Sequence, residues 1–173
     1  MQRPAHNSPS PRHPVTPSSS SSFLSRYAPL IAWTCFVLFA STASFSASNT
    51  SLVIRPLLLW LFPGINEASI DEVHFFIRKT AHFTEYAILA LLAARAFRTS
   101  TRRGLSKRWW LVSFALVAAV SLLDEYQQSF VPSRTSSIYD SLLDMTGGAC
   151  ALACAALLLT RRRKKFGNPR RTI

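Results

Sequence analysis

The sequence is poor in charged residues, and acids are the scarcest of them. Charged side chains make up 16% of the 173 residues, and only eight residues are Asp or Glu. The 20 Lys and Arg residues give a net charge of +12, but they occur mostly in blocks beside apolar runs. A soluble domain would spread them over its whole surface, whereas blocks of this kind are typical of membrane proteins. We therefore expect contact with a lipid bilayer and its anionic cytoplasmic leaflet, and no nucleic-acid partner.

The sequence also lacks the short motifs of common metal and catalytic sites. Its cysteines, Cys35, Cys150 and Cys154, form no CxxC or Cys/His spacing, and we interpret them as small buried hydrophobic residues. No HExxH and no nucleophile–base motif is present. Asp140 and Asp144 are spaced i, i+4 and could hold a metal with His82 and Asp124, but without such a motif we expect no metal and no cofactor. The catalytic residues of any reaction stay unassigned.

Apolar segments divide the chain into a polar tail, a membrane domain and a basic end. Residues 1–25 are rich in Ser and Pro and are expected to be disordered, and residues 161–173 are expected to form a basic cytoplasmic tail. Residues 26–160 form the predicted transmembrane domain, with spans at about 27–45, 75–97, 109–130 and 139–160. Residues 51–63 are too short to cross a bilayer and are predicted to lie at the interface. The spacing of Ser69 and Glu72 is that of a capping box, which predicts a helix start there.

Basic residues predict the orientation of these spans. Residues 98–108 contain five Lys or Arg and no acid, and five more basic residues follow the last span at 161–165. Such segments stay in the cytoplasm, so both termini are predicted to be cytoplasmic. The segment FASTASFSAS resembles the end of a signal peptide, which leaves open whether the first span is cleaved, although its full spanning length favours retention. The predicted fold is an all-α membrane bundle of about four helices with a polar cluster near the extracytoplasmic face.

Ionisable side chains within the apolar segments mark the candidate site. On the second span, Lys79, His82 and Tyr86 are spaced i, i+3, i+7 and share one helix face, with Glu85 beside them. The other polar positions on the third and fourth spans and between them are Asp124, Glu125, Gln128, Arg134, Asp140 and Asp144. Glu85 lies six residues inside Lys79 and Asp124 six residues inside Phe130, each roughly 9 Å down a helix. Asp144 lies five residues inside Tyr139, roughly 7.5 Å down. A charge at such depth costs several kcal/mol unless it is paired or hydrated, so we expect these residues to meet.

The cluster holds more acids than certain cations. Its five carboxylates face Arg78, Lys79 and Arg134, and carboxylates this close cannot all ionise without compensation. Shared protons, a protonated His82, a bound cation or a cationic ligand group would each provide it. Gly147 and Gly148 predict that the fourth helix packs closely against its neighbours at this level.

Two segments resemble the VanZ-like family of integral membrane proteins. They are KTAHFTEYAILALL at residues 79–92 and DEYQQSFVPSRTSSIYDSLLDMTGGA at residues 124–149. The polar positions of the family fall on Lys79, His82, Tyr86, Asp124, Glu125, Gln128, Arg134 and Asp140. Gln127 stands where many relatives carry His, and Ser133 where many carry Gly, so a mechanism with a second imidazole is doubtful. The resemblance implies a bacterial inner-membrane protein tied to the cell envelope or to glycopeptide (teicoplanin) resistance.

The leading hypothesis is a binding protein rather than an enzyme. An outer-facing polar pocket would hold an envelope lipid or a glycopeptide-type ligand through Lys79, His82, Tyr86, Asp124, Gln128, Arg134, Asp140 and Asp144. One alternative is a membrane enzyme acting on a lipid-linked substrate, with His82, Asp124 or Glu125 as the acid–base candidates. A second is a small proton-coupled transporter or flippase, against which the lack of an internal repeat argues. The sequence leaves the oligomeric state open.

Overall fold

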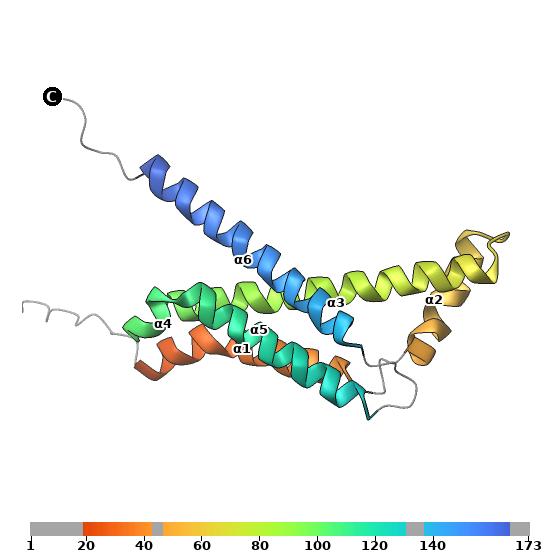
Figure 1. The fold of residues 1–173 in the computed structure, drawn as a ribbon, viewed down its shortest axis with the longest axis horizontal. Coiled ribbons are helices and arrows are strands. Elements are labelled where there is room, and N and C mark those ends of the chain that lie inside the picture. The colour runs from red at the N-terminus through yellow and green to blue at the C-terminus, as the bar shows by residue number, and fades with distance from the viewer. Residues whose placement is uncertain (1–18, 43–46, 131–136, 167–173) are drawn as a thin grey trace, which may run out of the picture.

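In the described residues of the chain, every regular element is a helix. The structure is a computed structural model that describes residues 19–42, 47–130 and 137–166. Its helices are α1 (Ser19–Ala40), α2 (Ala47–Leu61), α3 (Glu67–Arg98), α4 (Arg103–Lys107), α5 (Trp109–Gln128) and α6 (Ile138–Phe166) (Figure 1). The predicted all-α fold is confirmed.

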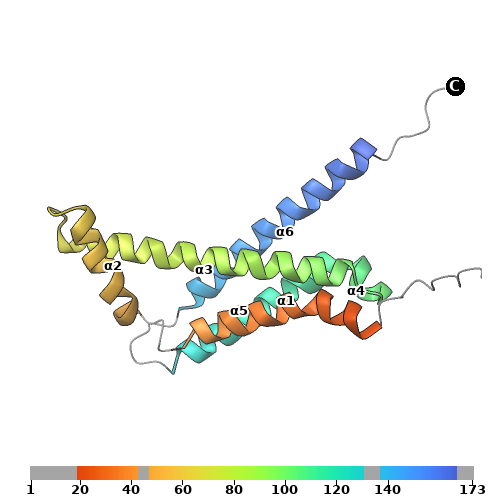
Figure 2. The same cartoon turned by 180° about the vertical axis from the view of Figure 1, so that it is seen from behind.

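Helix α3 is the centre of the bundle and contacts all the other described helices. Helices α1 and α5 run side by side along it, and α2 folds back against its N-terminal end (Figures 1 and 2). Helix α6 crosses α3 obliquely, and its C-terminal half extends away from the other helices. The strongest packing therefore lies where α3, α5 and the N-terminal half of α6 meet.

Small side chains allow this close packing. Ala90, Ala93 and Ala96 of α3 are fully buried, and Val117 of α5 is buried with them. On α6, a Cβ added at Gly147 would lie 2.5 Å from the Phe83 carbonyl oxygen of α3. A Cβ added at Gly148 would lie 2.8 Å from a methyl group of Val117. The predicted close approach of the fourth span at its glycines is therefore confirmed, because in a membrane helices associate through such contacts.

Within the described residues, three helical segments are long and apolar enough to cross a membrane, namely Phe23–Ala40, Trp109–Gln128 and Ile138–Arg162. Large apolar side chains such as Phe39, Leu122 and Leu157 point outward from them. Helix α3 is not among them, yet it lies between these helices and is about 48 Å long. The chain is thus an all-α membrane protein whose central helix carries several charged residues along its length.

Several boundaries differ from those predicted. Helix α1 begins at Ser19, within the segment 1–25 that was predicted to be a disordered tail. Residues 1–18 lie outside the described residues. The first helix ends at Ala40, five residues before the predicted end of the first span. Helix α2 spans Ala47–Leu61 rather than 51–63, and α6 continues to Phe166, into the predicted basic tail. Once a helix has nucleated, each added residue gains a hydrogen bond, and Arg and Lys are good helix formers.

The start of α3 also differs from its prediction. Ser69 does not begin the helix but lies in its first turn, where its N–H donates to the Asn66 side chain at 2.7 Å. Asn66 is therefore the N-cap, because its oxygen accepts from a backbone group that has no partner within the helix.

The three cysteines are exposed on the bundle rather than buried, so that interpretation was wrong. A thiol on the surface of a membrane helix meets an apolar environment, so it needs no burial inside the protein.

Candidate functional site

A buried polar cluster lies where α3, α5 and α6 meet. His82 and Tyr86 come from successive turns of α3, Asp124 from α5 and Asp144 from α6. Tyr86 is fully buried, and the two aspartates are each 1% exposed. Residues three or four apart lie on one face of a helix, so each helix presents its polar residues to the same interior region.

Hydrogen bonds orient the two buried carboxylates of this cluster. The Gln128 side-chain amide donates to Oδ2 of Asp124 at 3.0 Å. The Ser121 hydroxyl lies 3.2 Å from Oδ2 of Asp144 and 3.3 Å from the Ser141 carbonyl oxygen. Each donor comes from α5, so this helix fixes one carboxylate of its own and one of α6.

His82 closes the cluster from α3. Its Nδ1 lies 3.7 Å from Oδ1 of Asp144. One nitrogen of His82 and one carboxylate oxygen from each of Asp124 and Asp144 lie within 4.8 Å of one another. The Tyr86 hydroxyl borders the same two aspartates. Three helices thus bring an imidazole and two carboxylates to one point.

A second polar pair lies one helical turn away from this buried cluster. Lys79 of α3 and Asp140 of α6 form an ion pair, and each side chain is about one-quarter exposed. The Lys79 ammonium also lies 5.2 Å from the centre of the Phe75 ring. These residues line an open pocket with Phe76, Ser137, Tyr139 and Leu143. Of the predicted ligand residues that the structure describes, Lys79 and Asp140 thus pair with each other outside the buried cluster.

Glu125 has a local contact of its own. Its carboxylate is 8% exposed and accepts a hydrogen bond from the Ser137 backbone N–H at 2.8 Å. Ser137 directly precedes α6, so this bond fixes the start of that helix to the end of α5. Glu125 is not one of the three residues whose ligand atoms converge in the buried cluster.

Arg134 lies outside the described residues. Its predicted pairing with Asp140 or Asp124 stays a prediction.

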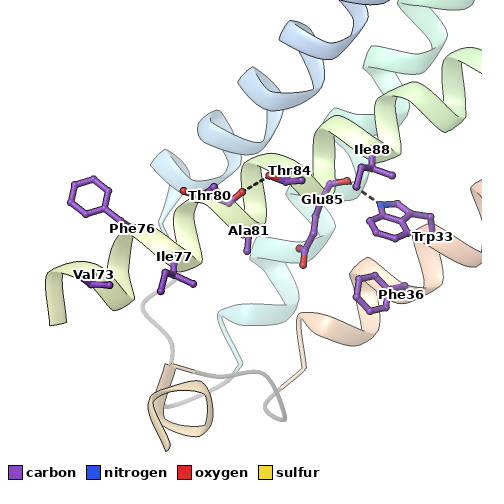
Figure 3. A pocket seen from close by; sticks show the side chains of 10 residues that line it. All are labelled: Trp33, Phe36, Val73, Phe76, Ile77, Thr80, Ala81, Thr84, Glu85 and Ile88. Carbon is purple, nitrogen blue, oxygen red and sulfur yellow. Dashed lines mark hydrogen bonds between the residues drawn. The ribbon is translucent and has the colours of Figure 1, made fainter. Parts of the chain in front are cut away.

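An apolar groove runs between α1 and α3 on the outside of the bundle (Figure 3). Its volume is about 670 Å³, and Trp33, Phe36, Phe76, Ile77 and Ile88 are among its lining residues. The Trp33 indole N–H donates to the Glu85 carbonyl oxygen at 3.0 Å and so joins α1 to α3 beside the groove.

A smaller polar cavity adjoins this groove. It measures about 120 Å³ and is lined by Ala40, Ser41, Thr50, Arg78, Ala81, His82 and Glu85. Ala81 and Glu85 line both spaces, and in Figure 3 the Glu85 carboxylate points away from the α3 axis on the side of Ala81. His82 borders the polar cavity and also belongs to the buried cluster. The groove, the polar cavity and the buried cluster are therefore neighbours along α3.

The predicted set of ligand residues omitted three residues: Trp33 of the groove, Glu85 of the polar cavity and Ser121 of the buried cluster. Glu85 was expected to meet Asp124 and Asp144 but was left out of the ligand set, and in the structure it lines the polar cavity instead. Ser121 lies three residues before Asp124 on the same helix face, which is a weaker signal. Trp33 carries no signal in the sequence, because an aromatic residue in an apolar span is usually a packing residue.

A model of the family described as VanZ/LLP1 matches residues 27–159 of the chain. The match extends from the middle of α1 into α6 and so includes every residue of the buried cluster. Neither a curated protein nor a solved structure matches the chain.

Proposed function

The chain belongs to the VanZ/LLP1 family of membrane proteins, and from the spaces between its helices we propose that it binds an amphipathic lipid of the bacterial cell envelope. The observation that carries this proposal is an apolar groove beside a polar cavity, with Ala81 and Glu85 lining both. A lipid needs both environments, one for its chain and one for its headgroup. Within a bilayer the acyl chain gains packing contacts rather than hydrophobic burial, and polar contacts at the headgroup add specificity.

The groove supports binding of the acyl chain. It lies between α1, a helix able to span a membrane, and the central helix α3. The aromatic rings of Trp33 and Phe36 form one wall, and Ile77 and Ile88 of α3 belong to the other. An acyl chain in this groove would contact apolar side chains over much of its length.

The polar cavity supports binding of the headgroup. Arg78 supplies a permanent positive charge there, and guanidinium groups bind phosphate and carboxylate oxygens in pairs. Thr50, Ser41 and His82 add groups that can donate or accept hydrogen bonds. An anionic or hydroxyl-bearing headgroup therefore fits this chemistry.

The size of the cavity favours a lipid over a glycopeptide-type ligand. Its volume of about 120 Å³ is small beside the 670 Å³ of the groove. A phosphate or a small alcohol occupies such a space, whereas a whole glycopeptide does not. A role in glycopeptide resistance would then be indirect, through the supply or distribution of an envelope lipid.

Charge distribution supports an inner-membrane location with both ends in the cytoplasm. Arg102, Arg103, Lys107 and Arg108 lie at the end of the bundle opposite Asn66, and basic segments are retained on the cytoplasmic side. In this orientation the polar cavity opens towards the outer half of the bilayer.

A lipid-binding measurement tests the proposal. The full chain is purified in mild detergent, and its bound lipids are identified and counted by native mass spectrometry. Ala81→Leu places a bulky side chain at the junction of groove and cavity, and Arg78→Gln removes the headgroup charge. We expect both variants to retain about tenfold less lipid, because a hydrogen bond to a charged group contributes about 1.5–3 kcal/mol.

Ala119→Leu is the matched control, since Ala119 is exposed on α5 and lines none of the three pockets described above. Equal lipid retention by Ala81→Leu and Ala119→Leu would contradict the proposal.

A second candidate is a reaction at the headgroup. His82 borders the cavity, and its Nδ1 faces the Asp144 carboxylate at 3.7 Å, so a small movement would bring the two groups into hydrogen-bond contact as an acid–base pair. Turnover of a labelled envelope lipid by the wild-type chain, abolished by His82→Gln, would support an enzyme. Lipid retention without turnover supports a binding protein.

A further inference from the structure

We propose that His82, Asp124 and Asp144 form a binding site for a divalent transition-metal ion such as Zn²⁺ or Mn²⁺. This proposal does not depend on lipid binding, and it revises the expectation from sequence that the chain holds no metal. Mixed imidazole and carboxylate ligands are those that Zn²⁺ and Mn²⁺ accept.

The first argument is the convergence of the three ligand atoms. They lie within 4.8 Å of one another, and a point equidistant from three atoms at that separation is about 2.8 Å from each. Metal–ligand distances for His nitrogen and carboxylate oxygen are about 2.0–2.2 Å. Each side chain would therefore move by less than about 1 Å to coordinate an ion, which small rotations of the side chains supply.

The second argument is the charge balance of a dry interior. Asp124 and Asp144 are each 1% exposed, and a neutral His82 adds no charge to them. Taking an isolated carboxylate out of water is costly, and two adjacent carboxylates repel each other. One divalent cation balances two ionised carboxylates and so removes both costs.

The third argument is an oxygen of Asp144 that is directed into the cluster. Its Oδ1 is buried, and among the described residues no hydrogen bond reaches it. Nδ1 of His82 lies 3.7 Å from this oxygen, which is longer than a hydrogen bond. A buried carboxylate oxygen in this position is suited to bind a cation.

Neighbouring polar side chains fix the two carboxylates by hydrogen bonds, as neighbouring residues do for the ligands of metal sites. Gln128 donates to Oδ2 of Asp124, and Ser121 donates to Oδ2 of Asp144. Ligating carboxylates are usually fixed by hydrogen bonds of this kind to their second oxygen. His82 also borders the polar cavity of about 120 Å³, which gives an ion a route to the buried residues.

The site is tested by metal content. The purified full chain is stripped with a chelator, dialysed against Zn²⁺ or Mn²⁺, and its bound metal is measured by elemental analysis. We expect one ion for each chain. His82→Gln and Asp144→Asn each remove one ligand, and they should weaken binding by more than the roughly 10–100-fold that follows loss of a supporting residue.

Asp140→Asn is the matched control because it removes a carboxylate one turn away on α6 that pairs with Lys79. We expect this variant to bind metal like the wild type. Equal binding by His82→Gln, Asp144→Asn and Asp140→Asn would overturn the proposal, since it would place the metal on other residues such as His6 or His13.

A spectroscopic measurement on the wild-type chain does not depend on how well the variants fold. Co²⁺ in a site with nitrogen and oxygen ligands absorbs visible light with an intensity that reports its coordination number, and added Zn²⁺ should displace it. A Co²⁺ spectrum indistinguishable from that of the hydrated ion would also overturn the proposal.

Discussion

At the residue scale, residues one helical turn apart make two different polar contacts, an ion pair at the edge of the bundle and a buried contact in its interior. Asp140 and Asp144 are one turn apart on α6, and Lys79 and His82 are about one turn apart on α3. Asp140 pairs with Lys79 at the edge of the bundle, and Asp144 faces His82 in its interior. The exposed fraction is about one-quarter for Asp140 and 1% for Asp144, so only the second must be compensated inside the protein.

Substitutions at the two glycines of α6 test how closely this helix packs against α3 and α5, and their effects should differ in size. A Cβ at Gly147 meets backbone of α3, whereas a Cβ at Gly148 meets a side chain that can rotate. We expect Gly147→Ala to destabilise the chain by about 1–3 kcal/mol, as overpacking does, and Gly148→Ala to destabilise it less. Thermal unfolding in detergent measures both.

Gly104→Ala is the control for these two variants, because no atom lies within 4 Å of a Cβ added there. Gly104 is inside the short helix α4, where Ala is preferred over Gly, so this variant should be neutral or slightly stabilising. Equal losses at Gly104 and Gly147 would show that α6 does not approach α3 as described.

At the scale of the elements, helix ends depend on single side chains from nearby segments. Asn66 caps α3, and Glu125 of α5 binds the Ser137 N–H ahead of α6. The Asn66 cap explains why the capping box predicted from Ser69 and Glu72 placed the start of α3 too late. The Asn66 oxygen reaches the Ser69 N–H, which a search for a Ser or Thr cap does not anticipate.

Removal of the Asn66 cap should loosen the first turn of α3. Asn66→Ala leaves the Ser69 N–H without this acceptor, and loss of an N-cap costs about 0.5–2 kcal/mol. We expect faster hydrogen exchange at Ser69 and its neighbours, with exchange in the buried segment around Ala93 unchanged. Asn66→Asp keeps a capping oxygen and should restore slow exchange at Ser69. Slow exchange at Ser69 in Asn66→Ala would contradict this assignment of the cap.

At the scale of the whole molecule, the polar helix is at the centre and the apolar helices surround it. This order reverses that of a soluble bundle, because lipid replaces water outside. The three candidate spans present apolar side chains outward, and α3 brings Lys79, His82 and Glu85 between them. A membrane protein can keep such a helix only if its charges are paired or bound to a ligand.

The predicted orientation is tested by cysteine labelling. The three native cysteines are exposed and are first replaced by Ala, after which Gly64→Cys or Thr101→Cys provides one thiol at either end of α3. We expect a membrane-impermeant reagent to label Gly64→Cys on intact cells and Thr101→Cys only after permeabilisation, because the basic segment is cytoplasmic. The reverse pattern would place the polar cavity on the cytoplasmic side and contradict the proposed location.

The sequence by itself determined the class of the protein, the approximate positions of the membrane helices and the face of each that is polar. Apolar length fixes a span, and the helical period fixes which residues share a face. The resemblance in residues 79–92 and 124–149 also determined the family, which the match over residues 27–159 confirms.

Only the tertiary structure decided which polar residues meet. Whether Asp140 or Asp144 faces His82, and whether Glu85 faces α5 or α1, depends on how far each helix is rotated and at what angle it crosses α3. Contacts between distant residues, such as Gly147 against Phe83, set that rotation and angle. The periodicity within one helix cannot determine them, because it contains no information about the neighbouring helix.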